Sequence, residues 1–201
     1  ACQILIIGDA KLGDGVGIWF HATLRADVNS ITIGEQTNIQ DNCVLHVTKA
    51  QALAVGKRCT IGHGAILHAC TIEDDCLIGM GSIVLDGSHI GTQCLVGAGS
   101  VVPPNKTYPP HSLIIGSPAR AIRQLTEEEL LHMKQNTLEY WHFGVDYVKA
   151  DNYRLELVCL LELLDRLIRA ADDQHIRLLE HKIGGNIADG FLVAYDYDGV
   201  Q

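Results

Sequence analysis

The chain has 201 residues, 47% of them hydrophobic, and it carries a formal net charge of −9. This length is ample for one domain with a buried core, or for a domain with an appendage. The negative charge and the lack of clustered Lys and Arg argue against a nucleic-acid partner. No apolar run approaches the roughly 18 residues of a membrane span, so we expect no such span.

The cysteines and the N-terminal residues bear on the compartment. The seven cysteines are an odd number without a CxxC pair, which favours a reducing compartment over a disulfide framework. No basic segment precedes a short apolar run near the N-terminus, as it would in a signal peptide. We therefore expect a cytoplasmic protein, or one in an organelle matrix if a leader has been removed.

A repeat of six residues runs from residue 7 to residue 102. Aliphatic residues recur at this spacing and are often followed by glycine, as in Ile33-Gly34, Ile61-Gly62 and Ile78-Gly79. This period fits neither a helix nor a free-standing strand, but it is typical of a hexapeptide parallel β-helix. The fifth place of each unit must then be small to fit the turn. Four of these small residues are cysteines that we expect to be buried: Cys43, Cys59, Cys76 and Cys94.

Two histidines share one column of this β-helix. Three units make one coil, so residues of equal phase in successive coils stack about 4.8 Å apart. If residues 48 to 53 form a loop, Leu45 and Leu67 are one coil apart, and His46 and His68 directly follow them. Stepping back one more coil places Arg25 in the same column.

A third histidine, His63, follows Gly62 on a different face of the prism, above Gln40 and Asp41. Within one chain it cannot join His46 and His68. In a homotrimer, the face with those two residues can meet the His63 face of a neighbour, which gives a three-histidine site with an open position. That is the ligand set of a catalytic zinc. The alternative is that the three histidines are ordinary core or surface residues.

The chain changes character after residue 103. Four of the five prolines lie between Val101 and Pro110, which indicates a cap and a return segment. Thr126 and Glu129 then form a capping box that opens a helix to about Lys149. Leucines lie nearly all round the stretch 154–173, so a helix there should pack against another surface. The Gly-rich and acidic tail after residue 183 is predicted to be a strand or disordered.

Three strings together resemble the gamma-class carbonic anhydrase family of β-helix proteins: LRADVNSITIGEQTNIQDNCVLHV, IGHGAILHACTIEDDCLIGMGSIVLDG and LIIGSPARAIRQLTEEE. The resemblance implies a mainly β fold, a left-handed parallel β-helix with C-terminal α-helices. The resemblance covers roughly residues 5 to 148. We expect a β-helix with a zinc site over 1–120, a helix packed along the prism over 121–149, and a helical extension and tail of unknown role over 150–201.

The same resemblance implies the residues of the site. The zinc ligands of the family match His46, His63 and His68, with His63 donated across the trimer interface. The other matching residues are Arg25, Asp27, Asn38, Gln40, Asp41 and Tyr140. Gln40 would hold the zinc-bound water or CO2, and Arg25 would pair with Asp41 across the interface. An interface ion pair with a purely structural role and a Tyr140 that only packs are the alternatives for these residues.

The implied activity is the reversible hydration of CO2 to bicarbonate. Zinc lowers the pKa of its bound water to roughly 7, so hydroxide is available at neutral pH. Iron or cobalt could take the place of zinc. The proton-exporting glutamates of the best-characterised members are missing: Val28 stands at one position, and the stretch 47–58 holds no carboxylate. We therefore expect slow turnover, or proton transfer through Tyr140 or buffer.

Two other functions remain open at this point. Many hexapeptide proteins are acyltransferases that use acetyl-CoA, and fold alone would allow this activity. It does not explain why His46 and His68 are in register. The missing glutamates and the long tail favour a third possibility, a non-catalytic assembly subunit that keeps a metal ion for trimer stability.

Overall fold

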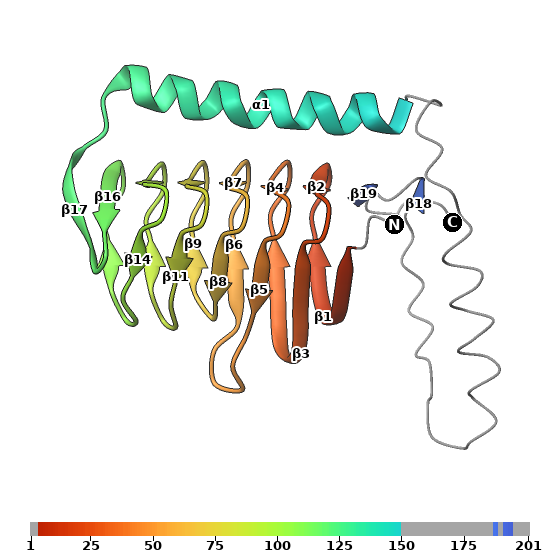
Figure 1. The fold of residues 1–201 in the computed structure, drawn as a ribbon, viewed down its shortest axis with the longest axis horizontal. Coiled ribbons are helices and arrows are strands. Elements are labelled where there is room, and N and C mark those ends of the chain that lie inside the picture. Colours follow the sequence, from red (N-terminus) through yellow and green to blue (C-terminus); the bar gives the residue numbers. More distant parts are fainter. Residues whose placement is uncertain (1–3, 150–186, 189–190, 195–201) are drawn as a thin grey trace.

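The computed structural model describes residues 4–149, 187–188 and 191–194 of the chain. It is a parallel β-solenoid with one helix along its side (Figure 1). The mainly β fold and the hexapeptide coils that the sequence predicts are therefore confirmed. One C-terminal helix lies in the described part of the chain, and the helix predicted within 154–173 lies outside it.

The coils build a prism with three faces. The first face holds the N-terminal half of β3 (Thr23–Ile33), then β5 (Val44–His46), β8 (Ile66–His68), β11 (Ile83–Val84) and β14 (Val101–Val102). The second face holds the C-terminal half of β3, then β6 (Leu53–Val55), β9 (Thr71–Ile72), β12 (His89–Ile90) and β15 (Thr107–Tyr108). The third face holds β2 (Val16–Ile18), β4 (Asn38–Ile39), β7 (Thr60–Ile61), β10 (Leu77–Ile78), β13 (Leu95–Val96) and β16 (Ser112–Gly116).

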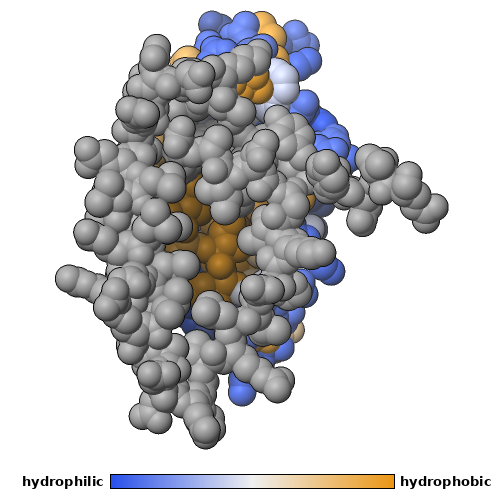
Figure 2. Space-filling view, turned by 90° about the vertical axis from the view of Figure 1, so that its right-hand side faces the viewer, coloured by the Kyte–Doolittle hydropathy of each residue, from blue (hydrophilic) through white to orange (hydrophobic). Residues whose placement is uncertain are grey.

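Further strands, which do not belong to the regular coils, cover the two ends of the prism. β1 (Leu5–Leu12) pairs in parallel with β3 along both of its halves, and β17 (Ala119–Gln124) pairs antiparallel with β16. At the N-terminal end, β19 (Phe191–Ala194) pairs antiparallel with β2 and with β18 (Ile187–Ala188). Figure 2 looks onto this end and shows hydrophobic residues gathered at its centre. β19 and β18 are therefore the last two strands of the sheet that forms the third face.

The register between coils agrees with the phase predicted from the sequence. Leu45 pairs with Leu67 and His46 with His68, while Arg25 pairs with His46 one coil earlier. The loop between β5 and β6 ends one residue earlier than predicted, because Leu53 begins β6 and is buried. Its side chain enters the core at the same phase as Ile31, with which it pairs.

The core is a set of stacked aliphatic columns, one along each face. Ile39, Ile61 and Ile78 of the third face are fully buried, and so are Leu45 and Leu67 of the first. The four predicted corner cysteines are also buried: Cys43, Cys59, Cys76 and Cys94. Burial raises the pKa of the Cys43 thiol to about 11. A thiol with such a pKa stays protonated at neutral pH, so it acts as a small apolar residue.

The helix α1 (Glu127–Lys149) runs along the third face (Figure 1). Its capping box is formed as predicted: the Thr126 backbone N–H donates to Glu129 Oε2 at 2.8 Å, and the Glu129 N–H donates to Thr126 Oγ1 at 3.2 Å. Met133 and Thr137 are buried against the prism. Within the described ranges, no helix combines the length and the apolar character needed to cross a membrane.

Glycines after the aliphatic residues let successive coils stack closely. A Cβ added at Gly79 would lie 2.5 Å from the backbone nitrogen of Ala98 in the next coil. Gly81, two residues later, has a φ of 65° and open space where its Cβ would be. Alanine tolerates such a turn conformation here, since Ala69 has a φ of 45°. The first glycine is thus required by space, whereas the backbone conformation of the second favours glycine without requiring it.

We expect Gly79→Ala to destabilise the protein by about 3 kcal/mol, because the next coil cannot move without breaking its ladder. Gly81→Ala should cost only about 1 kcal/mol, the penalty of a left-handed alanine. Urea unfolding of both variants at equal protein concentration measures the difference. Equal losses would show that coil spacing does not limit stability at Gly79.

Candidate metal centre

The centre of the candidate site is the pair of histidines that end two adjacent strands of the first face. His46 is the last residue of β5, and His68 is the last residue of β8. Because these strands pair in register, Nδ1 of His46 lies 3.1 Å from Nε2 of His68. The two rings are tilted by 52°, with their centroids 5.1 Å apart. Both side chains are partly exposed, so the pair opens to the surface.

A carboxylate contacts the outer nitrogen of each ring. Asp27 Oδ1 lies 3.2 Å from Nε2 of His46, and Asp86 Oδ1 contacts Nδ1 of His68. Carboxylates accept hydrogen bonds, so they favour the proton on these outer nitrogens. The inner nitrogens then face each other with their lone pairs. At 3.1 Å, two lone pairs require a proton or a cation between them.

Arg25 extends this column by one coil. Its guanidinium contacts Asp27 within the same chain. Burial opposes ionisation of Asp27, but the hydrogen bonds with Arg25 and His46 outweigh it and lower the pKa of the carboxyl. Asp27 is therefore ionised at neutral pH and can accept a hydrogen bond from His46. The pairing of Arg25 with Asp41 that the family resemblance implies concerns a second subunit.

His63 lies at the opposite edge of the first face, in the turn between β7 and β8. Its Nδ1 is 2.9 Å from Asp41 Oδ2, and its Nε2 is 3.3 Å from the hydroxyl of Tyr140. Its backbone N–H donates to Gln40 Oε1 at 3.1 Å. Its place above Gln40 and Asp41 therefore agrees with the predicted register.

Tyr140 reaches His63 from α1 and packs among aromatic rings. Its ring makes an edge contact with Trp19, at a centroid distance of 5.6 Å. Burial and the nearby charge of Asp41 raise the pKa of its hydroxyl. Tyr140 therefore stays protonated at neutral pH. Its hydroxyl contacts His63 and its ring contacts Trp19, so its position is compatible with the predicted packing role.

Gln40 and Asn38 lie inside the prism wall beside His63. Both are 3% exposed, and Gln40 Nε2 donates to Asn38 Oδ1 at 3.3 Å. Asn38 Nδ2 donates in turn to Thr60 Oγ1 at 2.9 Å. The two predicted site residues are thus connected to each other and, through Thr60, to Thr137 of α1.

The residues can be tested for their fit to zinc. Two ligand nitrogens at 2.0–2.1 Å from a tetrahedral zinc lie about 3.3 Å from each other. The inner nitrogens of His46 and His68 are 3.1 Å apart. Each ring also has the outer carboxylate that zinc-binding histidines usually have. These two residues fit a zinc ion. No cluster of three potential ligands occurs among the residues that the structure describes, because His63 lies at the other edge of the face.

Sequence reasoning missed Asp86. Val84 pairs with Leu67, which places Asp86 one coil above the turn that follows His68. Counting one coil beyond Ala69, the residue after His68, would have found it. It also missed the buried threonines Thr60 and Thr137, whose hydroxyl oxygens are 3.0 Å apart although 77 residues separate them. No repeat predicts that contact, because it depends on how α1 lies on the prism.

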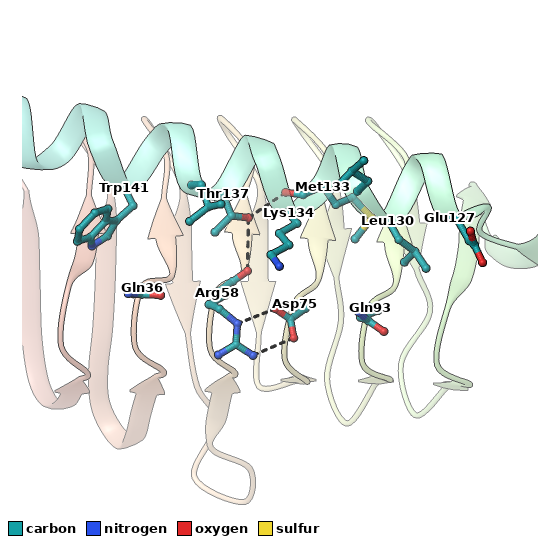
Figure 3. Close-up of a pocket in the computed structure, with 12 residues that line it drawn as sticks. Gln36, Arg58, Asp75, Gln93, Glu127, Leu130, Met133, Lys134, Thr137 and Trp141 are labelled. Carbon is teal, nitrogen blue, oxygen red and sulfur yellow. Dashed lines mark hydrogen bonds and ion pairs between the residues drawn. The ribbon is translucent and has the colours of Figure 1, made fainter.

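A groove of about 520 Å³ lies between α1 and the edge of the prism (Figure 3). Arg58 crosses its floor and donates to both carboxylate oxygens of Asp75, at 2.8 and 2.9 Å. Leu130, Leu138 and Trp141 of α1 form its apolar wall. None of the predicted site residues lines this groove, so it is separate from the histidine site.

Comparison with known proteins identifies the family. Residues 69–104 match the family model described as bacterial transferase hexapeptide (six repeats). The chain is 42% identical to a carbonic anhydrase of Geobacillus kaustophilus over 150 residues, which are 75% of this chain and 82% of that protein. It is 34% identical to the mitochondrial gamma carbonic anhydrase 2 of Arabidopsis thaliana over 180 residues, which are 87% of this chain and 65% of that protein.

A solved structure agrees with this assignment of the fold. The crystal structure of a hexapeptide transferase family protein from Anaplasma phagocytophilum is 38% identical, with a TM-score of 0.67. The match covers 72% of this chain and 89% of that one. With the repeat, the coil register and these relatives in agreement, the chain belongs to the gamma-class carbonic anhydrase-like family of hexapeptide-repeat proteins.

Proposed function

We propose that this protein is a zinc-dependent carbonic anhydrase that reversibly hydrates CO2 to bicarbonate at a site between the subunits of a homotrimer. The observation that carries the proposal is the pair His46 and His68, whose inner nitrogens face each other at 3.1 Å. Their outer nitrogens both face carboxylates, so the inner nitrogens are left to share a proton or to bind a metal ion. Iron or cobalt would satisfy the same ligands.

The third ligand in this proposal is His63 of a neighbouring subunit. His63 and the His46–His68 pair lie at opposite edges of the first face, so three such faces packed around a threefold axis would join them. The outward side chains of this face support an interface. Val44 and Ile66 are 41% and 38% exposed, and Met80 beside the His63 corner is 60% exposed. Contiguous exposed apolar residues are typical of surfaces that bind a protein partner.

A bound zinc would supply a water molecule that loses its proton near pH 7. The chain's own residues would hold and orient the reactants. Asp41 accepts from Nδ1 of His63, which leaves Nε2 as the nitrogen for a metal ion. Binding there would release the Tyr140 hydroxyl, which contacts Nε2 in the single chain. Gln40 would offer its amide to the bound water or to CO2.

Proton export is the step for which this chain is least equipped. Val28 and the carboxylate-free loop 47–52 stand where the family resemblance implies glutamates. Tyr140 is a poor substitute as a proton acceptor, because burial raises the pKa of its hydroxyl. We therefore assign the proton transfer to soluble buffer.

Acyl transfer is the second candidate function. The transferase family name of the Anaplasma phagocytophilum structure favours it, at 38% identity. An acyltransferase would bind acetyl-CoA and would not need the facing lone pairs of His46 and His68. Acetyl-CoA binding by isothermal titration calorimetry, measured on metal-free and zinc-loaded protein, distinguishes the two functions.

The first prediction concerns the histidine pair. Replacing His68 by Ala should abolish bound zinc, measured by inductively coupled plasma mass spectrometry, and lower CO2 hydration in stopped flow by at least about 100-fold, since no nucleophile is activated. His89→Ala is the matched control. His89 is also paired with a carboxylate, at 2.7 Å from Glu73, but it lies on the second face. That variant should keep both zinc and activity.

Two outcomes would contradict the proposal. Wild-type protein that binds zinc in a trimer but does not hydrate CO2 would point to the non-catalytic assembly subunit. A monomer in analytical ultracentrifugation without bound metal would remove the intersubunit site altogether.

A second prediction concerns Asp86. Asp86→Asn keeps the shape of the side chain but removes the charge that holds the proton on Nδ1 of His68. Loss of such an outer partner typically weakens metal affinity by about 10–100-fold. Competition with a chromophoric chelator measures the change. Asp86→Glu should recover part of the affinity, and an unchanged affinity in Asp86→Asn would show that the carboxylate does not orient the ring.

A third prediction concerns proton transfer. If buffer removes the proton, kcat for CO2 hydration should rise with imidazole concentration at constant ionic strength and then level off. Tyr140→Phe should leave this dependence unchanged. A kcat that is independent of buffer would indicate a proton-transfer group within the protein.

A further inference from the structure

A chain of buried side-chain hydrogen bonds leads from the His63 corner to α1. Gln40, Asn38, Thr60 and Thr137 follow one another in it, and each is at most 7% exposed. The links are 3.3 Å from Gln40 to Asn38, 2.9 Å from Asn38 to Thr60, and 3.0 Å from Thr60 to Thr137. We refer to these four residues as the polar thread.

Backbone groups at both ends give the polar thread one direction. At the helix end, the Thr137 hydroxyl has two backbone carbonyls to donate to, that of Met133 at 3.2 Å and that of Arg58 at 3.4 Å, which leaves its lone pairs to accept from Thr60. In the middle, Asn38 Nδ2 lies 3.4 Å from the carbonyl of Cys59, which only a donor can satisfy. At the site end, the His63 N–H can only donate, so Gln40 must turn its oxygen to it.

The direction of these hydrogen bonds determines which residue the oxygen of the Gln40 amide contacts and which residue its nitrogen contacts. Oε1 is bound to the backbone of His63, and one N–H of Nε2 is bound to Asn38. The second N–H of Nε2 takes no part in the thread. It remains the group that can donate to a ligand oxygen.

We propose that Thr60 and Thr137 are positioning residues that hold the Gln40 amide with an N–H available to the oxygen of the bound reactant. The helix α1 would thereby act on the site through its Thr137 hydroxyl, although Thr137 does not contact the histidines. The amide orientation follows from the hydrogen bonds alone. Its effect on turnover rests on the proposed function.

Removing a hydroxyl from the thread should loosen the amide without changing the metal ligands. Thr60→Val removes the acceptor of Asn38 Nδ2 and leaves it only the longer bond to Cys59. Thr137→Val removes the acceptor of the Thr60 hydroxyl, which can then turn toward Asn38 and compete for its orientation. Buried threonine and valine have nearly the same shape, so packing is kept.

We expect Thr60→Val to lower kcat/KM for CO2 hydration by about 10-fold and Thr137→Val by about 3-fold, as a misplaced donor would. Bound zinc should be unchanged in both. Thr60→Ser and Thr137→Ser keep the hydroxyl and should return kcat/KM to within about twofold of wild type. Thr92→Val is the matched control, because the Thr92 hydroxyl donates to the backbone carbonyl of Asp74, outside the thread.

A readout that needs neither metal nor activity completes the test. In protein labelled with ¹⁵N-glutamine, the side-chain amide signals of Gln40, assigned by their loss in Gln40→Asn, should shift or broaden in both valine variants. They should stay in place in Thr92→Val. Unchanged signals together with wild-type kcat/KM in both valine variants would overturn the proposal.

The two hypotheses can fail separately. A wild-type protein without CO2 hydration would remove the proposed function, and the amide signals would still test the thread. An active wild type whose valine variants lose stability equally with Thr92→Val, but neither activity nor amide position, would leave the function standing and reduce Thr60 and Thr137 to packing residues.

Discussion

The site depends on the in-register stacking of coils one strand spacing apart. Each hexapeptide contributes one buried aliphatic residue, and a close glycine contact such as that of Gly79 keeps successive coils at a fixed distance. Side chains of equal phase are therefore neighbours across the coils, whatever their distance in the sequence. The facing nitrogens of His46 and His68 are one result of this arrangement. No separate binding loop has to be folded to bring these two rings together.

The same stacking explains why so much of the site could be predicted from the sequence. Once the period of six is recognised, counting places Arg25, His46 and His68 in one column and His63 above Gln40. The burial of Cys43 and Cys59 follows from the same phase. The capping box of α1 could also be predicted, because its two hydrogen bonds join residues only three apart.

Other features could not be predicted, for identifiable physical reasons. The contact between Thr60 and Thr137 depends on the rotation of α1 over the third face, which no repeat encodes. In the single chain, Arg25 contacts Asp27, and Asp41 contacts His63. The sequence alone cannot decide whether such carboxylates bind within a chain or across an interface. The association of subunits depends on the shape of exposed faces, here marked by Val44, Ile66 and Met80.

The loop between β5 and β6 shows how a solenoid can vary in length without losing a site. Adding one hexapeptide between His46 and His68 would turn every later residue onto the next face of the prism and separate the two rings. Adding a whole coil would move them to twice the strand spacing, about 9.6 Å. Residues inserted in an outward loop, such as 47–52, shift the numbering of the chain but not the phase of its coils. Evolutionary changes in length should therefore gather at such loops and spare the strands between the two histidines.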